Sequence, residues 1–158
     1  MTLDDVITDI IEPAALLLPG IPDNTAARAM LLSIGQQESR FAFRRQMGDG
    51  PARGFFQFER CGGVKALYNF DGTTDLLRSV CKARACPFDI PTIWATLETD
   101  DILACCLARL LLWSDPQALP DDAAGGWDLY ARTWRPGRPH RETWDSYYRR
   151  SVEALGAA

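Results

Sequence analysis

The chain has 158 residues, of which 47% are hydrophobic and 24% charged, values that are ordinary for one soluble globular domain. Its formal net charge of −4 argues against a general nucleic-acid binder, which would normally be basic. The acidic residues 1–5 lack the basic region of a secretory signal, and no apolar run is long enough to span a bilayer. We therefore expect neither a targeting segment nor membrane insertion.

Helical patterns dominate from the start of the chain. Residues 3–18 carry valine and isoleucine at helical spacing, and Pro13 predicts a kink or a boundary among them. A second helix is expected from a cap at Asp23 or Asn24 to about Phe41. Its apolar stripe consists of Ala27, Met30, Leu31 and Ile34, followed by Glu38 and Phe41.

Glu38 is the most informative residue of this helix. It lies four residues after Ile34 and eight after Met30, so it shares their apolar face. A carboxylate on a buried stripe is unfavourable unless it has a partner or a chemical role, and burial raises the pKa of such a group. The sequence leaves two interpretations open: a proton donor in a cleft, or an ion-pair partner of Arg28, Arg44, Arg45 or Arg53.

The middle of the chain is predicted to hold a loop, a turn and a buried helix. Residues 42–53 are polar and carry turn signals, and residues 55–58 predict a short strand or an extended turn. Short helices are expected at 64–68 and 74–85, and Pro91 opens another. Thr99 is expected to cap a helix that is apolar nearly all round from 102 to 112, with Asp100 and Asp101 at its positive end. We predict that this is the buried central helix.

Two further helices complete the chain. One starts at residues 120–122 and is broken by the prolines at 136–139, and the other covers 143–155. Six arginines between residues 127 and 150 make this end locally basic, which suits either an anionic polymer or an ordinary solvated face. No repeat or linker interrupts the sequence. We therefore expect a single, mainly α domain over residues 1–158 with little or no β-structure near the cleft.

The chain has five cysteines, and their odd number together with the missing signal favours reduced thiols. Cys105 and Cys106 lie in the apolar helix and are expected to be core residues, whereas pairing of Cys81 with Cys86 stays open. The sequence contains no Cys-x-x-Cys, and its one histidine, His140, lies beside prolines in a predicted loop. We expect no metal site and no cofactor.

Two motifs together resemble the lysozyme-like glycosidases, especially goose-type lysozymes and the related soluble lytic transglycosylases. Glu38-Ser39 at the end of a helix is similar to the family's catalytic Glu-Ser. Residues 54–59, Gly-Phe-Phe-Gln-Phe-Glu, resemble its Gly-Leu-Met-Gln-Val-Asp string, and Gly48-Asp49-Gly50 occupies the place of a conserved loop aspartate. The Gly-Gly-Trp-Asp-Leu-Tyr at 125–130 is similar to a cleft segment, although Ala131-Arg132 departs from the Asn-Ala that follows there.

This resemblance covers residues 25–60 well and 120–155 weakly, and it implies a lysozyme-like fold. It also implies roles for single residues. Glu38 is the general acid, and Asp49 and Glu59 are the candidates for positioning the attacking water. The implied substrate-binding residues are Ser39, Gly54, Phe56, Gln57 and Tyr130.

The implied activity is that of a muramidase, which cleaves the β-1,4 bond between N-acetylmuramic acid and N-acetylglucosamine. The implied partner is the glycan strand of peptidoglycan, with no nucleic acid, and the protein is expected to be a monomer. The small size and the single domain favour a phage endolysin or a virion-associated lysin. Such an endolysin waits in the host cytoplasm until it is released to the cell wall. If Asp49 and Glu59 do not reach the cleft, a lytic transglycosylase forming 1,6-anhydro ends is the alternative.

Other interpretations stay open on the sequence alone. Asp49 is also typical of a turn, and Glu59 of a helix cap or a solvated position. Gln57 has a backbone hydrogen bond as its structural alternative, and Tyr130 and Trp134 at helical spacing are often core residues. A non-catalytic peptidoglycan-binding or virion structural protein, or a helical DNA-associated protein, is the rival class of function.

Overall fold

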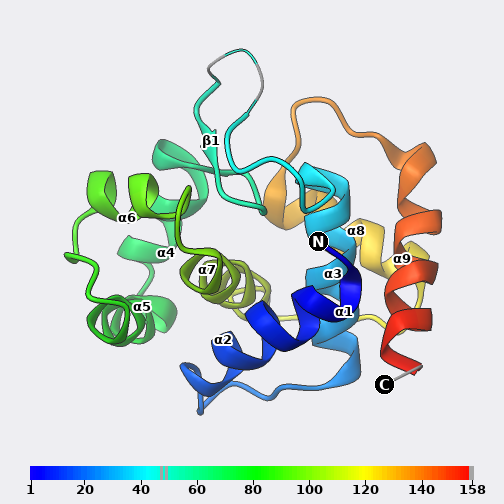
Figure 1. The fold of residues 1–158 in the computed structure, drawn as a ribbon, viewed down its shortest axis with the longest axis horizontal. Coiled ribbons are helices and arrows are strands. Elements are labelled where there is room, and N and C mark those ends of the chain that lie inside the picture. The colour runs from blue at the N-terminus through cyan, green and yellow to red at the C-terminus, as the bar shows by residue number, and fades with distance from the viewer. Residues whose placement is uncertain (47, 49, 157–158) are drawn as a thin grey trace.

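The computed structural model describes residues 1–46, 48 and 50–156, and it contains one mainly helical domain (Figure 1). The prediction of a mainly α single domain is confirmed. Its elements in chain order are α1 (Leu3–Val6), the π-helical η1 (Ile7–Ile11), α2 (Glu12–Leu16), α3 (Thr25–Ser39), β1 (Ala52–Arg53), β2 (Phe58–Glu59), the π-helical η2 (Arg60–Val64), α4 (Lys65–Asn69), α5 (Asp71–Ala83), α6 (Ile90–Thr96), α7 (Asp101–Trp113), α8 (Ala123–Trp134) and α9 (Arg141–Gly156).

Helix α7 is the centre of the domain, as its sequence predicts. Every residue from Leu103 to Leu110 is buried, and α2, α3, α4, α5 and α8 all contact the helix (Figure 1). The expected cap is one residue off: the side chain of Asp100, not Thr99, accepts the hydrogen bond from the Leu103 amide, at 2.9 Å. The Thr99 hydroxyl instead donates to the Thr96 carbonyl at the end of α6. Among the described residues, none of the helices combines the length and apolarity needed to cross a membrane.

Pro13 neither ends nor splits the first helix. The helical conformation continues from Leu3 to Leu16, but it widens to π-helix in the turn immediately before the proline. There the Glu12 amide donates to the Ile7 carbonyl, five residues back. A proline in a regular α-helix lacks its own donor and clashes with the carbonyl four residues earlier. A wider π-helical turn lets a helix accommodate a proline. The structure therefore has a π-helical segment where the sequence predicts a kink.

Helix α9 packs along α3, and a small buried polar network fixes the two helices in register. The Ser33 and Ser151 hydroxyls lie 3.0 Å apart, and the Gln36 amide nitrogen donates to Ser151 at 2.9 Å and to the Tyr147 carbonyl at 3.2 Å. All three of these side chains are buried or nearly so. Because buried polar groups are unfavourable without partners, sliding α9 along α3 would leave these groups unpaired.

Helix α3 ends at Ser39, two residues before the expected boundary, because Arg40 and Phe41 both adopt left-handed backbone angles (φ 56° and 51°). This reversal folds the Phe41 ring back onto α3, directly against Gly35, where an added Cβ would overlap the ring. The ring then packs edge-on against Phe55 at 5.5 Å and Phe56 at 6.2 Å. The helix end that carries Glu38 is therefore tied to the hairpin that follows.

The end of α5 explains why Cys81 and Cys86 lie close together. The Cys86 amide donates to the Cys81 carbonyl at 2.9 Å, the Ala85 amide donates to Lys82, and Ala85 is left-handed (φ 51°). These bonds define a Schellman motif, whose first and last residues usually make an apolar contact. The two thiols fill that pair of positions. All five cysteines are free, and burial raises the pKa of Cys81 to about 12.

Replacing Gly35 with alanine should destabilise the domain. Alanine gains roughly 1 kcal/mol in helix propensity, but a methyl group forced into the Phe41 ring costs more than that, and we expect a net loss of about 1–2 kcal/mol. Urea denaturation followed by circular dichroism measures this loss. Gly156→Ala is the matched control, since nothing lies within 4 Å of a Cβ at this helical glycine. Equal stability of the two variants would contradict the assigned packing of Phe41.

Candidate functional site

The Glu38 carboxyl group lies in the last turn of α3 and is half-buried. Burial removes water from it and raises its pKa from 4.5 to about 7. The Tyr130 hydroxyl donates a hydrogen bond to Glu38 Oε1 at 2.6 Å, which opposes part of this rise because it favours the charged form. The group thus holds a proton near neutral pH, as the apolar stripe predicts.

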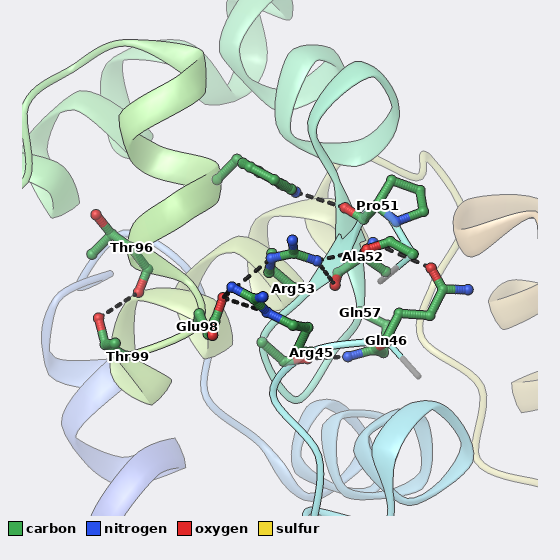
Figure 2. Close-up of polar contacts among 12 residues, drawn as sticks. Arg45, Gln46, Pro51, Ala52, Arg53, Gln57, Thr96, Glu98 and Thr99 are labelled. Atoms are coloured by element: carbon green, nitrogen blue, oxygen red, sulfur yellow. Dashed lines mark hydrogen bonds and ion pairs between the residues drawn. The ribbon is translucent and has the colours of Figure 1, made fainter. Parts of the chain in front are cut away.

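The ion-pair interpretation of Glu38 is wrong, because the arginines considered for it all bind other carboxylates. Arg28 pairs with Asp23 at 2.6 Å and with Glu12, and Arg44 pairs with Asp101 at 2.6 Å. Arg45 and Arg53 both pair with Glu98 (Figure 2). Within the described part of the chain, Glu38 has no cationic partner that would keep it ionised.

Tyr130 on α8 is both a core residue and a site residue, two roles that the sequence presents as alternatives. Its ring stacks on Trp144 with centroids 5.1 Å apart, and Trp127 lies 5.4 Å away. Only its hydroxyl reaches Glu38. Burial and the adjacent carboxyl raise the pKa of Tyr130, so the hydroxyl stays a donor. Gly126 permits this packing, because a Cβ there would lie 3.2 Å from both the Met30 sulfur and the Trp144 ring.

Trp134 contacts the hairpin, and the sequence does not predict this contact. Its indole nitrogen donates to the Phe56 carbonyl at 3.0 Å, and its ring lies 5.8 Å from Phe58 and 6.3 Å from Tyr130. This side chain therefore connects α8 to the hairpin that carries residues 54–59. The only signal for it in the sequence is its spacing of four residues from Tyr130, which places both on one helix face.

The Gly-Phe-Phe-Gln-Phe-Glu string forms a tight turn whose residues serve the backbone. Gly54 is left-handed (φ 74°), and a Cβ there would lie 2.8 Å from the Leu97 carbonyl oxygen, so no other residue fits without a shift. The Gln57 side-chain nitrogen donates to the Gly54 carbonyl at 2.8 Å, which is the structural alternative expected for it. Phe56 is fully buried, so its ring is a core group and cannot contact a sugar.

A polar network holds this hairpin in place (Figure 2). Glu98, just beyond α6, receives Arg45 at 3.1 Å and Arg53 at 3.2 Å, one from each side of the loop. The Trp94 indole donates to the Pro51 carbonyl at 2.8 Å, while the Arg53 guanidinium lies over the Trp94 ring. Arg45 and residues 51–53 are thus anchored to Trp94 of α6 and to Glu98 by charge, a hydrogen bond and stacking together.

Ser39 and Glu59, two further predicted site residues that the structure describes, form no hydrogen bond with the Glu38 carboxyl. The Ser39 hydroxyl is buried and closes the end of α3, donating to the Gly35 carbonyl and accepting from the Phe41 amide, so it is not free for substrate. Glu59 is exposed on β2, opposite Ala52. Asp49 lies outside the described residues. Among the predicted residues that the structure describes, Tyr130 is the one whose side chain forms a hydrogen bond with the Glu38 carboxyl.

The substrate groove beside Glu38 stays a prediction, because this residue lines neither of two cavities in the molecule. Glu38 lines neither the cavity of about 460 Å³ beside Gln36 nor the cavity of about 10 Å³ beside Arg109. The chemistry available at this site therefore comes from two groups: a protonated carboxyl and the hydroxyl that holds one of its oxygens.

Tyr130→Phe should raise the pKa of Glu38 above its present value of about 7. The variant keeps the ring and its stacking but loses the hydrogen bond that favours the carboxylate. Loss of a hydrogen bond worth about 1.4 kcal/mol changes the pKa of the carboxyl by about 1. A ¹³C NMR titration of the Glu38 carboxyl measures this change. Tyr148→Phe, a buried tyrosine next to Trp144, is the control. A lower pKa in Tyr130→Phe would contradict the assigned hydrogen bond.

Glu38→Gln should stabilise the protein at high pH only. Since the folded-state pKa is raised from 4.5 to about 7, the stability associated with the protonated group is complete below about 4.5 and is lost as pH rises through about 7. Glutamine cannot ionise, so the variant should exceed the wild type at pH 8 by on the order of 3 kcal/mol and match it at pH 4. Thermal unfolding at the two pH values is the measurement, and a constant difference between them would show that the carboxyl is not desolvated.

In comparisons with known proteins, no family model, no curated protein and no solved structure matches this chain. The resemblance to lysozyme-like glycosidases therefore rests on the motif residues themselves.

Proposed function

We propose that the protein is a peptidoglycan-degrading muramidase in which Glu38 is the general acid. One observation carries the proposal: a carboxyl group with a pKa of about 7, without a cationic partner in the described part of the chain, held by a tyrosine hydroxyl. General acids work best when their pKa lies near the operating pH, because such a group is both protonated and able to give its proton away. The Glu38-Ser39 and 54–59 motifs connect this group to glycosidic bond cleavage.

The two oxygens of Glu38 have separate roles in the proposed reaction. Oε1 accepts the hydrogen bond from Tyr130, which leaves Oε2 to carry the proton and give it to the oxygen of the bond being cleaved. As the proton leaves, negative charge develops on the carboxylate. The hydrogen bond to Oε1 then becomes charge-assisted and stronger, so Tyr130 stabilises the product form of the acid. Tyr130 is in this sense a positioning residue that acts through Glu38.

The source of the attacking group separates the two variants of this reaction. Inverting hydrolysis uses a second carboxylate roughly 6.5–9.5 Å from the acid to activate water. Glu59 is the candidate within the described residues, and it has to act from an exposed position on β2. In the alternative, a lytic transglycosylase, a hydroxyl of the substrate attacks and leaves a 1,6-anhydro end. Mass spectrometry of digested sacculi separates reducing ends, left by hydrolysis, from anhydro ends.

The biological setting that we propose is a phage endolysin or a virion-associated lysin that acts on the wall of a Gram-negative host. An endolysin of this kind acts after release from the host cytoplasm. The rival is a non-catalytic peptidoglycan-binding or virion structural protein. Binding to purified sacculi without any lysis by the wild-type protein would favour this rival.

Glu38→Gln should lower the rate of wall lysis at least about 100-fold, the usual contribution of a general acid. In the wild type, the rate should fall as pH rises through about 7, because Glu38 then loses its proton. The assay is loss of turbidity of permeabilised Gram-negative cells between pH 5 and pH 9. Glu153→Gln, an exposed glutamate of α9, is the matched control. Unchanged lysis by Glu38→Gln would remove the acid from the mechanism.

A further inference from the structure

A cavity of about 460 Å³ lies between the N-terminal segment, the end of α3 and helix α9. Figure 1 shows the N-terminal end of the chain beside α3, and α1 also contacts α9. Small-molecule sites typically have volumes of about 300–1,000 Å³, so this cavity has the size of a ligand site. Its walls include Leu3, Gln36, Arg40, Phe41, Tyr147 and Arg150.

This cavity is separate from the Glu38 carboxyl. Gln36 and Glu38 are two residues apart on α3, so their side chains point about 200° apart around the helix axis. The cavity thus opens on the face opposite the acid, and the proposed hydrolysis does not use the residues that line it.

Two guanidinium groups give the cavity a positive charge. Arg40 and Arg150 are both exposed, and neither forms an ion pair with an acidic side chain of the described residues, whereas Arg28, Arg132 and Arg141 all do. The carboxylate of Asp5 in α1 is occupied, because it accepts a hydrogen bond from the amide of the N-cap residue Thr2 at 2.8 Å and so completes the capping box of α1. Paired arginine donors without a protein partner are well suited to bind a carboxylate.

Gln36 adds an acceptor to these donors. Its side chain is 7% exposed, and its nitrogen is occupied by bonds to the carbonyls of Leu32 and Tyr147 and to the Ser151 hydroxyl. This fixes the orientation of the amide and leaves Oε1, which accepts no hydrogen bond from the described residues, to receive an N–H of a ligand. The side chains of Leu3, Phe41 and Tyr147 supply apolar wall beside it.

We propose that this cavity binds a short peptide that ends in a free carboxylate. The terminal carboxylate lies between Arg40 and Arg150, a peptide N–H donates to Gln36 Oε1, and the side chains of the peptide contact Tyr147 and Phe41. Such a carboxylate occurs both in wall-derived peptides with D-residues and in the C-termini of L-peptides, which share this chemistry. The inference is independent of the proposed function, because peptide binding requires no cleavage.

The test is an NMR titration of the full chain with N-acetyl-dialanine, in its D,D and L,L forms, against the corresponding carboxamides. We expect the acid to shift the resonances of Tyr147 and Phe41, and the carboxamide to bind at least about tenfold more weakly, since a charged hydrogen bond contributes about 1.5–3 kcal/mol. A preference for the D,D or the L,L form identifies the source of the peptide.

Two variants test the residues. Arg150→Gln and Arg40→Asn should each weaken binding by about tenfold, and asparagine is chosen at position 40 because it tolerates the left-handed backbone there. Arg138→Gln is the matched control, because Arg138 is an exposed arginine that carries the same charge and is not among the residues that line the cavity. Equal binding of acid and carboxamide overturns the proposal. So does an equal loss in Arg138→Gln, or the same shifts with inorganic phosphate alone, because either result indicates a general attraction for anions.

Discussion

The hydrogen bond between Tyr130 and Glu38 is the interaction on which the site depends. It joins residues 92 positions apart in the chain and connects the end of α3 to α8. Burial of the carboxyl and the hydroxyl partner act in opposite directions on the pKa of Glu38, and burial has the larger effect. The group therefore keeps a pKa near 7 while one of its oxygens stays fixed. A cation in place of the hydroxyl would stabilise the carboxylate and abolish the acid.

The aromatic residues around Tyr130 explain how this hydroxyl is held. Tyr130 stacks on Trp144 of α9, and α9 is locked to α3 by the Ser33, Gln36 and Ser151 network. Trp134, which like Tyr130 belongs to α8, donates a hydrogen bond to the Phe56 carbonyl and so fixes the hairpin to α8. Three helices and a turn together thus fix the position of the Tyr130 hydroxyl oxygen. Helices positioned by packing hold a functional group more rigidly than a free loop does.

The sequence predicts the local features of this site well. The helical stripe places Glu38 on a buried face, and the all-round apolar pattern of residues 102–112 identifies the central helix. Asn24, one of the two expected caps, caps α3, and Pro91 lies in the first turn of α6. In each case, residues close in sequence determine the outcome. The position of Thr99 next to Asp100 shows the limit, because both residue types cap helices and only the backbone decides between them.

What the sequence does not predict is set by contacts between distant segments. Periodicity does not show that Trp134 meets Phe56, 78 residues away, or that Arg45 and Arg53 converge on Glu98 and are thereby withdrawn from Glu38. The resemblance implies that Gly54, Phe56 and Gln57 bind substrate, yet in the structure these three residues satisfy the needs of a tight turn. A single sequence does not distinguish side chains that stabilise a turn of the backbone from side chains that bind a sugar.

The end of α3 also explains why an acid and a cation sit on its opposite faces. The last turn of a helix carries partial negative charge from its unpaired carbonyls, which disfavours a carboxylate and favours a guanidinium. Glu38 lies in that turn, and burial raises its pKa to about 7. Arg40, one residue beyond the helix, places its guanidinium at this end and lines the cavity on the far face. One feature of the backbone is therefore compatible with both proposals, a neutral acid on one side of the helix and an anion-binding cavity on the other.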